Sequence, residues 1–409
     1  MREAWIIDGV RTPRGKGKAN GSLHELHPQE LLAQCLNALA ARTGVDPKIV
    51  EDVIVGNGNS VGDHGSCIGR LSVLAAGWPQ ETPGFTLNRF CGSGQQAVTL
   101  AAMGILSGMQ EVVVGGGVES MSRWPVDEGV TTIDGGNAHL RELYPIVPQG
   151  ISADLIATLE GFTREQCDEL AVTSQERAAK AVVEGRFDRS IVPVVRPDGS
   201  VALDHDEHAR PGTTMDVLAK LPPSFEALGT SHFDGYSETF DAMCVRTYPT
   251  IDHVEHVHHA GNSSGVVDGA SALLVTSSDF ARANGLTPRA RIRMTAVAGA
   301  EPVIMLTAPA PASKLCLEKA GMTVDDIDLW EINEAFAAVV LKAMRELGLD
   351  PEKVNVNGGA MALGHPIGAT GGMLIETAID ELERSDQTTA LITMCTGGGM
   401  ATATIIERI

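Results

Sequence analysis

Residues 88–96 have the sequence Asn-Arg-Phe-Cys-Gly-Ser-Gly-Gln-Gln, and residues 357–371 have the sequence Asn-Gly-Gly-Ala-Met-Ala-Leu-Gly-His-Pro-Ile-Gly-Ala-Thr-Gly. Each stretch joins a short apolar run to a segment with helical periodicity through a glycine-containing turn. Similar strand-like and helical patterns alternate along the whole chain, which predicts an α/β fold. We expect strands at 4–8, 53–55, 86–90, 112–114, 328–332, 354–356 and 390–394, and helices at 28–41, 91–106, 164–184, 334–347 and 371–382.

The two ends of the chain resemble each other. Three pairs of positions, Asn57 and Asn333, Cys91 and His365, and Gly115 and Gly397, are separated by 276, 274 and 282 residues. This near-constant spacing favours a duplicated half. The alternative is a chance likeness between strand–glycine–helix units, which any α/β protein contains.

The length of 409 residues also favours more than one domain, because a single core stops growing at about 250–300 residues. The stretch 124–259 is rich in Pro, Asp and His and fits neither half. We therefore predict an N-terminal half at 1–123, completed by about 260–277. A loop or lid domain is expected at 124–259, and a C-terminal half at 278–409.

Composition excludes several classes of function. The formal net charge of −21 argues against a nucleic-acid partner, which needs a cationic face. No apolar run reaches the roughly 18 residues of a membrane span, and residues 1–10 do not have the pattern of a signal peptide. The seven cysteines are dispersed and odd in number, a pattern typical of reduced thiols in the cytoplasm.

Four segments contain residues whose type and position suit a role in catalysis. Cys91 lies where a strand meets a helix, whose positive end favours a thiolate, but this effect is worth only roughly 0.3–1 kcal/mol, so a base is needed. His365 lies in a loop too glycine-rich for an ordinary connection. Cys395 precedes three glycines whose N–H groups are suited to an oxyanion. Asn333 opens an expected helix. For each residue a structural role is the alternative: a packed cysteine, a core histidine, or a helix N-cap.

Together the four segments resemble the thiolase family over essentially the whole chain: the Cys91 segment, N-E-A-F at 333–336, G-G-A-x-A-L-G-H-P-x-G at 358–368, and C-x-G-G-G at 395–399. Each motif alone is weak, but their combination is very specific. The resemblance implies a thiolase-like duplicated core of five layers, αβαβα, with an inserted loop domain. It also implies a homodimer or homotetramer.

The resemblance implies a role for each residue. Cys91 is the nucleophile that carries the acyl group, and His365 is its base and a donor to the thioester oxygen. Cys395 is the second acid and base. Asn333 holds a water in one oxyanion hole, and the N–H groups of Cys91 and Gly397 form the other.

Five further positions match the path of coenzyme A in the family. Arg210 matches the arginine near the adenine, and Phe225, Ala260, Ser264 and Phe336 match positions along the adenine and pantetheine. The alternatives are a solvated loop charge for Arg210 and core packing for the two phenylalanines. Coenzyme A is itself an anion, so on a chain this acidic its site needs local Arg or Lys.

The chain also departs from the family pattern. Pro148-Gln149 replaces a common His-Met pair, Val217 replaces a common serine, and some thirty residues separate Gly229 from Ala260 where about three are usual. We expect this extra segment to be a polar surface loop at the mouth of the coenzyme A site. A metal site is the alternative for its histidines, which are His232, His253, His256, His258 and His259.

The predicted reaction is therefore coenzyme A-dependent thiolytic cleavage of a 3-ketoacyl-CoA and the reverse Claisen condensation of acetyl-CoA. Acyl-CoA and CoA are the expected partners, and we expect neither a metal nor a redox cofactor. One rival is a ketoacyl synthase on the same fold, which the second thiol, Cys395, disfavours. The other is a catalytically silent coenzyme A-binding protein, which the intact Cys91, His365 and Cys395 disfavour.

Overall fold

The computed structural model describes residues 2–124 and 133–409. A mixed sheet runs through the molecule in the strand order β10–β11–β12–β9–β1–β8–β5–β3–β4, with β2 paired to β8. A separate two-stranded sheet pairs β6 with β7. The strands are β1 (Ala4–Arg11), β2 (Gly15–Lys16), β3 (Asp52–Gly56), β4 (Phe85–Leu87), β5 (Val112–Ser120), β6 (Val194–Val195), β7 (Val201–Leu203), β8 (Val267–Ser277), β9 (Ala290–Gly299), β10 (Leu329–Ile332), β11 (Thr389–Thr396) and β12 (Met400–Arg408).

The two halves of the large sheet have the same connectivity. In the N-terminal half, β3 pairs parallel to β5, β5 antiparallel to β8, and β8 antiparallel to β1. In the C-terminal half, β10, β11, β12 and β9 repeat these pairings in the same order. The halves meet where β1 pairs with β9, through Trp5 opposite Arg291 and Ile6 opposite Ala290.

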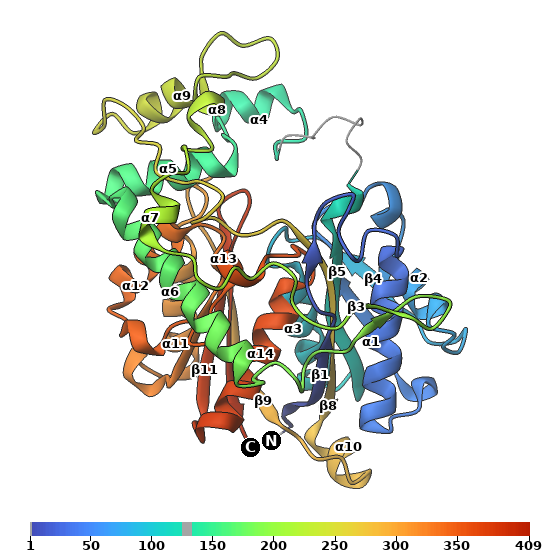
Figure 1. The fold of residues 1–409 in the computed structure, drawn as a ribbon. Helices are drawn as coiled ribbons and strands as arrows, with labels where there is room; N and C mark the ends of the chain where they lie inside the picture. Colours follow the sequence, from blue (N-terminus) through green and yellow to red (C-terminus); the bar gives the residue numbers. More distant parts are fainter. Residues whose placement is uncertain (1, 125–132) are drawn as a thin grey trace.

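Helices and sheet halves alternate in five layers (Figure 1). The middle layer is α3 (Ser93–Leu106) and α14 (Thr370–Ser385), whose apolar residues share one core with strands of both halves. Two further cores form on the outer faces of the sheet. Their helices are α1 (Pro28–Thr43) and α2 (Ile68–Ala75) on the N-terminal half, and α11 (Pro309–Ala320) and α12 (Ala337–Leu347) on the C-terminal half. The remaining helices outside the insertion are α10 (Ser278–Ala283) and α13 (Ala360–Leu363).

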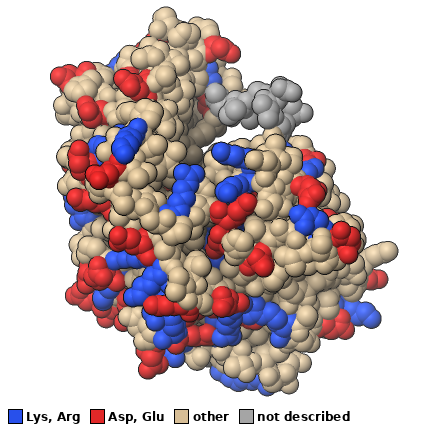
Figure 2. Space-filling model, in the orientation of Figure 1, with Lys and Arg blue, Asp and Glu red and all other residues tan. Residues whose placement is uncertain are grey.

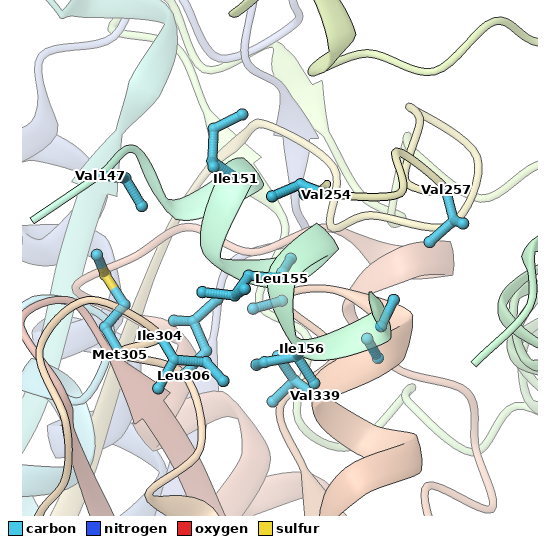
Figure 3. Packing of buried hydrophobic residues seen from close by; sticks show 14 of the residues in the cluster. Val147, Ile151, Leu155, Ile156, Val254, Val257, Ile304, Met305, Leu306 and Val339 are labelled. Carbon is cyan, nitrogen blue, oxygen red and sulfur yellow. The ribbon is translucent and has the colours of Figure 1, made fainter. Parts of the chain in front are cut away.

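An insertion lobe, residues 133–259, lies between β5 and β8. Figure 3 shows Ile151, Leu155 and Ile156 of α5 in contact with apolar side chains of 254–257, of 304–306 and of α12. The lobe is thus attached to the C-terminal half by a buried apolar contact. Its helices are α4 (Ala138–Leu143), α5 (Gln149–Glu160), α6 (Arg164–Val183), α7 (Met215–Leu218), α8 (Glu226–Gly229) and α9 (Phe240–Thr247).

The α/β fold is as predicted, but several predicted elements are wrong at their ends. The helix expected at 91–106 begins at Ser93, and the one expected at 334–347 begins at Ala337, so Asn333 does not cap it. No strand forms at 354–356, where Val354 makes a single bridge to Trp330 and Asn355 has a φ of 47°. That left-handed backbone is incompatible with a continuing strand.

The prediction of a polar surface loop is wrong for the end of the histidine-rich segment, whereas His232 and His253 within it are exposed as predicted. His258 and His259 are 0% and 1% exposed. His258 Nδ1 lies 2.7 Å from Asp154 of α5, and His259 Nε2 lies 2.8 Å from Asp168 of α6. Burial is possible because each imidazole pairs with a carboxylate.

Two features are absent from the described part of the chain. Within it, no helix is both long and apolar enough to cross a bilayer. Nor does it contain a group of three or more His, Cys, Asp or Glu side chains arranged to hold a metal ion.

Candidate active site

Cys91 lies in a tight turn between β4 and α3. Phe90 has a φ of 48°, a left-handed conformation that is costly for a bulky residue. Ser93 closes the turn, because its Oγ accepts the Arg89 N–H at 2.8 Å and donates to the Phe90 carbonyl at 2.6 Å. The thiol, only 5% exposed, is therefore held at the end of the middle layer by a rigid backbone.

The surroundings of the Cys91 sulfur have opposing effects on its pKa. Burial is the largest effect and raises the pKa to about 11, and the nearby Glu119 carboxylate raises it too. Hydrogen bonds from the Cys91 N–H, the Gln149 side chain and the Gly397 N–H oppose this rise. The expected help from the helix end is thus outweighed by burial, and the resting thiol is protonated until a base removes its proton.

His365 is held as a neutral base. Gly364 before it has a φ of 94°, and a Cβ there would lie 2.4 Å from Val267, so only glycine fits. His365 Nδ1 lies 2.5 Å from Thr370 Oγ1, and that hydroxyl donates its one hydrogen to the Pro366 carbonyl at 2.9 Å. Thr370 therefore accepts Nδ1–H, which leaves a lone pair on Nε2. Burial, with the Arg14 charge, lowers the His365 pKa to about 3.

Asn333 lies beside this base. Its N–H donates to the Thr393 carbonyl of β11 at 3.0 Å, which fixes the backbone just beyond β10. Its Nδ2 lies 3.5 Å from His365 Nε2. Once Nε2 has accepted a proton, it and the nearby amide donor can both contact one substrate oxygen.

Cys395 lies near the end of β11, and Gly397 lies in the turn that leads to β12. Gly398 and Gly399 have φ values of 74° and 78°, so the hairpin requires glycine at both positions. Cys395 is completely buried, and burial raises the pKa of its thiol, with a further rise when Cys91 is a thiolate. The two thiols therefore interact electrostatically, and the Gly397 N–H faces the sulfur of Cys91.

Comparison with known proteins identifies this arrangement. Residues 4–245 match the family "Thiolase, N-terminal domain" and residues 286–408 match "Thiolase, C-terminal domain". The chain belongs to the thiolase family. This thiolase is 39% identical to a steroid 3-ketoacyl-CoA thiolase of Mycobacterium tuberculosis, over 100% of this chain and 95% of that one. It is 40% identical to a 3-oxoadipyl-CoA/3-oxo-5,6-dehydrosuberyl-CoA thiolase of Escherichia coli, over the full length of both chains.

Solved structures agree with the family assignment. The thiolase superimposes with a TM-score of 0.84 on a Bacillus anthracis acetyl-CoA acetyltransferase, at 37% identity over 100% of this chain and 99% of that one. Human mitochondrial 3-ketoacyl-CoA thiolase also gives 0.84, at 34% identity and the same coverage. The predicted thiolase fold is confirmed, and the protein is an acyltransferase.

The predicted coenzyme A positions are only partly brought together. The rings of Phe225 and Phe336 meet edge-to-face with centroids 6.0 Å apart, and the Ser264 N–H donates to the Ala335 carbonyl beside Phe336. A Cβ on Gly150 would lie 2.3 Å from the Phe225 ring, so this aromatic pair reaches the start of α5, next to Gln149.

Two of the predicted positions lie further out. Ala260 and Arg210 are exposed, and the Arg210 N–H donates to Gln175. Figure 2 shows Lys and Arg side chains facing the hollow between the insertion lobe and the N-terminal half.

Sequence reasoning missed several residues at this site. Gln149 was noted only as a departure from the family pattern, yet its side chain faces Cys91. Glu119 carried no signal at all. It is completely buried and accepts the N–H groups of Gly58 at 2.7 Å and Gly368 at 2.9 Å, so it ties the His365 loop to the N-terminal half. Burial raises the pKa of Glu119 to about 7, although these hydrogen bonds act to lower it.

Proposed function

We propose that this thiolase cleaves 3-ketoacyl-CoA with coenzyme A, and condenses acetyl-CoA in reverse, through an acyl group on Cys91. The observation that carries this proposal is the pairing of a neutral His365, with a free lone pair on Nε2, and two neighbouring buried thiols. The tautomer of His365 supports its role as the base for Cys91. The second thiol, Cys395, supports a separate role as proton donor and acceptor. The reaction belongs to fatty acid and lipid metabolism.

In the first half-reaction His365 Nε2 accepts the Cys91 proton, and the sulfur attacks the 3-keto carbon. The bond between carbons 2 and 3 breaks, and its electron pair leaves as the enolate of acetyl-CoA. Cys395 donates a proton to carbon 2 of that enolate. The N–H groups of Cys91 and Gly397 stabilise the oxyanion on the attacked carbonyl, while Asn333, through a water, and His365 stabilise the enolate oxygen.

In the second half-reaction the Cys395 thiolate takes the proton of the coenzyme A thiol. The coenzyme A sulfur attacks the acyl carbon on Cys91, and the Cys91 sulfur leaves and recovers its proton from His365. All protons and electron pairs are returned. The steps need no metal or redox cofactor, and acyl-CoA and coenzyme A act only as substrates.

We propose that Phe225, Ser264 and Phe336 line the pantetheine path, with Ala260 and Arg210 nearer the nucleotide. The contact of Phe225 with Gly150 supports this, because it leads towards Gln149 and Cys91. The Lys and Arg side chains facing the hollow in Figure 2 suit the coenzyme A phosphates.

The test is to mix the purified protein with acetoacetyl-CoA and coenzyme A and follow the loss of the 3-ketothioester. Rapid loss with release of two acetyl-CoA supports the proposal. A silent coenzyme A-binding protein would leave the thioester intact, and a ketoacyl synthase would not carry out thiolysis at a comparable rate. Repeating the assay across acyl lengths then defines the acyl specificity.

We further propose a homodimer or homotetramer. The edge strand β4 carries Phe85, 37% exposed, and Met103, Leu106 and Met109 near the end of α3 are 52%, 47% and 85% exposed. An uncovered edge and an apolar surface of this kind favour association with another copy. Light scattering after gel filtration measures the state directly.

We also propose a cytoplasmic location, which the seven free cysteines support.

For the domains we propose the division at 1–123 with 260–277, 124–259, and 278–409. The return of β8 to pair with β1 and β5 after the insertion lobe supports it. Residues 125–132 of that division lie outside the described residues.

A further inference from the structure

A small polar cavity lies beside Asn333 and Thr370, the partner of His365. Its volume is about 10 Å³, and its walls come from Arg14 after β1, from β10 and the residue after it, from α13 with its flanking glycines, and from α14. On this measure roughly 10–15 Å³ is enough for one water molecule. The lining residues that matter here are Arg14, Glu331, Asn333 and Thr370.

Polar atoms converge on this cavity without partners. Glu331 and Asn333 are 0% and 1% exposed, and both line the cavity. Among the described residues, both carboxyl oxygens of Glu331, Asn333 Oδ1 and Arg14 Nε have no hydrogen-bond partner. Buried groups of this kind in folded proteins are nearly always bonded to protein or to an internal water.

Glu331 and Arg14 can supply hydrogen-bond donors to this cavity. Glu331 is completely buried, and together with the charges of Glu334 and Glu381 this raises its pKa well above the usual value, against the effect of Arg14. Burial thus favours the protonated form of Glu331, which carries one O–H donor. Arg14 is anchored by Asp206, which accepts its backbone N–H at 2.8 Å and lies 3.4 Å from its Nη1.

The orientation of the Asn333 amide depends on what its oxygen meets. Nδ2 faces His365 Nε2 at 3.5 Å, where a donor is needed. The opposite flip would put an oxygen against the Nε2 lone pair and an amide N–H₂ against the cavity. The two orientations have the same shape, so only hydrogen bonding selects between them.

We propose that Arg14 and Glu331 hold one water in this cavity and that this water donates to Asn333 Oδ1, which fixes the amide with Nδ2 towards the substrate. Glu331 and Arg14 are then positioning residues, since neither touches the reacting atoms. The inference rests on the proposed function, because it assumes that Asn333 acts in thiolysis.

The test is a double-mutant cycle between Glu331 and Asn333 in the acetoacetyl-CoA thiolysis assay. Glu331→Leu should lower kcat about three- to tenfold, the equivalent of roughly one hydrogen bond, with KM for coenzyme A unchanged. Glu331→Gln keeps an N–H donor of similar shape and should retain most of the activity. In an Asn333→Ala background, Glu331→Leu should cause no further loss, because its effect acts through Asn333.

Independent losses that multiply in the double variant would overturn the proposal, and so would a Glu331→Leu enzyme with wild-type kcat. If Glu331→Leu does not fold, Arg14→Met in the same cycle replaces it, with the same expectation. A high-resolution crystal structure gives a second readout, in which a water peak must lie within hydrogen-bond distance of Glu331 and Asn333 Oδ1. A wild-type protein without thiolysis would instead refute the proposed function.

Discussion

His256 offers a test of how the extra segment is attached to the thiolase core. Its Nδ1 lies 2.7 Å from Asp154 Oδ2 of α5, and its Nε2 lies 3.1 Å from Asp241 Oδ2 of α9. The side chain is 9% exposed. Burial alone would lower the His256 pKa, but the two carboxylates outweigh it and raise the pKa to about 10. The ring is therefore a cation shared by two lobe helices.

Replacing this cation should destabilise the lobe. His256→Gln removes two charge-assisted hydrogen bonds, each worth about 1.5–3 kcal/mol, and leaves two carboxylates without their shared cation. Desolvation of the native ring and partial solvent screening offset part of that loss. We expect the free energy of unfolding to fall by about 1–3 kcal/mol at pH 6, measured by chemical denaturation.

The pH dependence has a definite sign. Because the folded pKa of His256 lies above the unfolded value of about 6.5, its contribution is complete below about pH 6.5 and is lost as the pH rises through about 10. The difference between wild type and His256→Gln should therefore shrink steadily from pH 6 to pH 10. A difference that stays constant, or grows, over this range would refute the reasoning.

His253 provides the matched control. It also contacts two carboxylates, with Nδ1 2.6 Å from Asp252 and Nε2 3.2 Å from Glu255, but its side chain is 67% exposed. Exposed pairs of this kind contribute little. His253→Gln should leave stability unchanged within error, and an effect equal to that of His256→Gln would show that burial is not the deciding factor.

Three further predictions concern the chemistry. Cys395→Ala should still acylate with acetyl-CoA but lose about 10²–10⁴-fold in condensation rate, because only carbon–carbon chemistry needs its proton; failure to acylate would reverse the two thiol roles. Thr370→Val should lower kcat about tenfold by releasing the His365 tautomer, whereas Thr370→Ser should not, and equal losses would point to packing instead. Activity should survive EDTA, since no step uses a metal; a loss on chelation that zinc restores would contradict this.

The candidate residues that lie in a distinctive local sequence could be proposed from the sequence alone. Cys91, His365 and Cys395 each lie in a glycine-bounded motif, and glycines at close backbone contacts leave a strong local pattern. The duplicated connectivity was visible for the same reason, because each half repeats strand, glycine and helix. Helix starts are harder to predict. Ser93 begins a helix after a local turn that its own side chain closes, whereas Ala337 follows residues that are hydrogen-bonded to distant segments.

The contacts that depend on distant segments could not be predicted. His258 is buried because Asp154, 104 residues earlier, accepts its Nδ1–H and two backbone N–H groups in the same segment. Gln149 reaches Cys91 only because α5 is attached to the C-terminal half. Arg14 and Glu331 meet at one cavity from opposite ends of the chain, and neither has a local pattern that indicates a shared role.

The central claim is that Cys91 carries the acyl group, and peptide mass spectrometry after incubation with acetyl-CoA tests it most directly. We predict one added acetyl group on the peptide that contains Cys91, its disappearance when coenzyme A is added, and no label in Cys91→Ala. An acetyl group on Cys67, Cys316 or Cys395 in the wild-type protein, with Cys91 unmodified, would contradict the account.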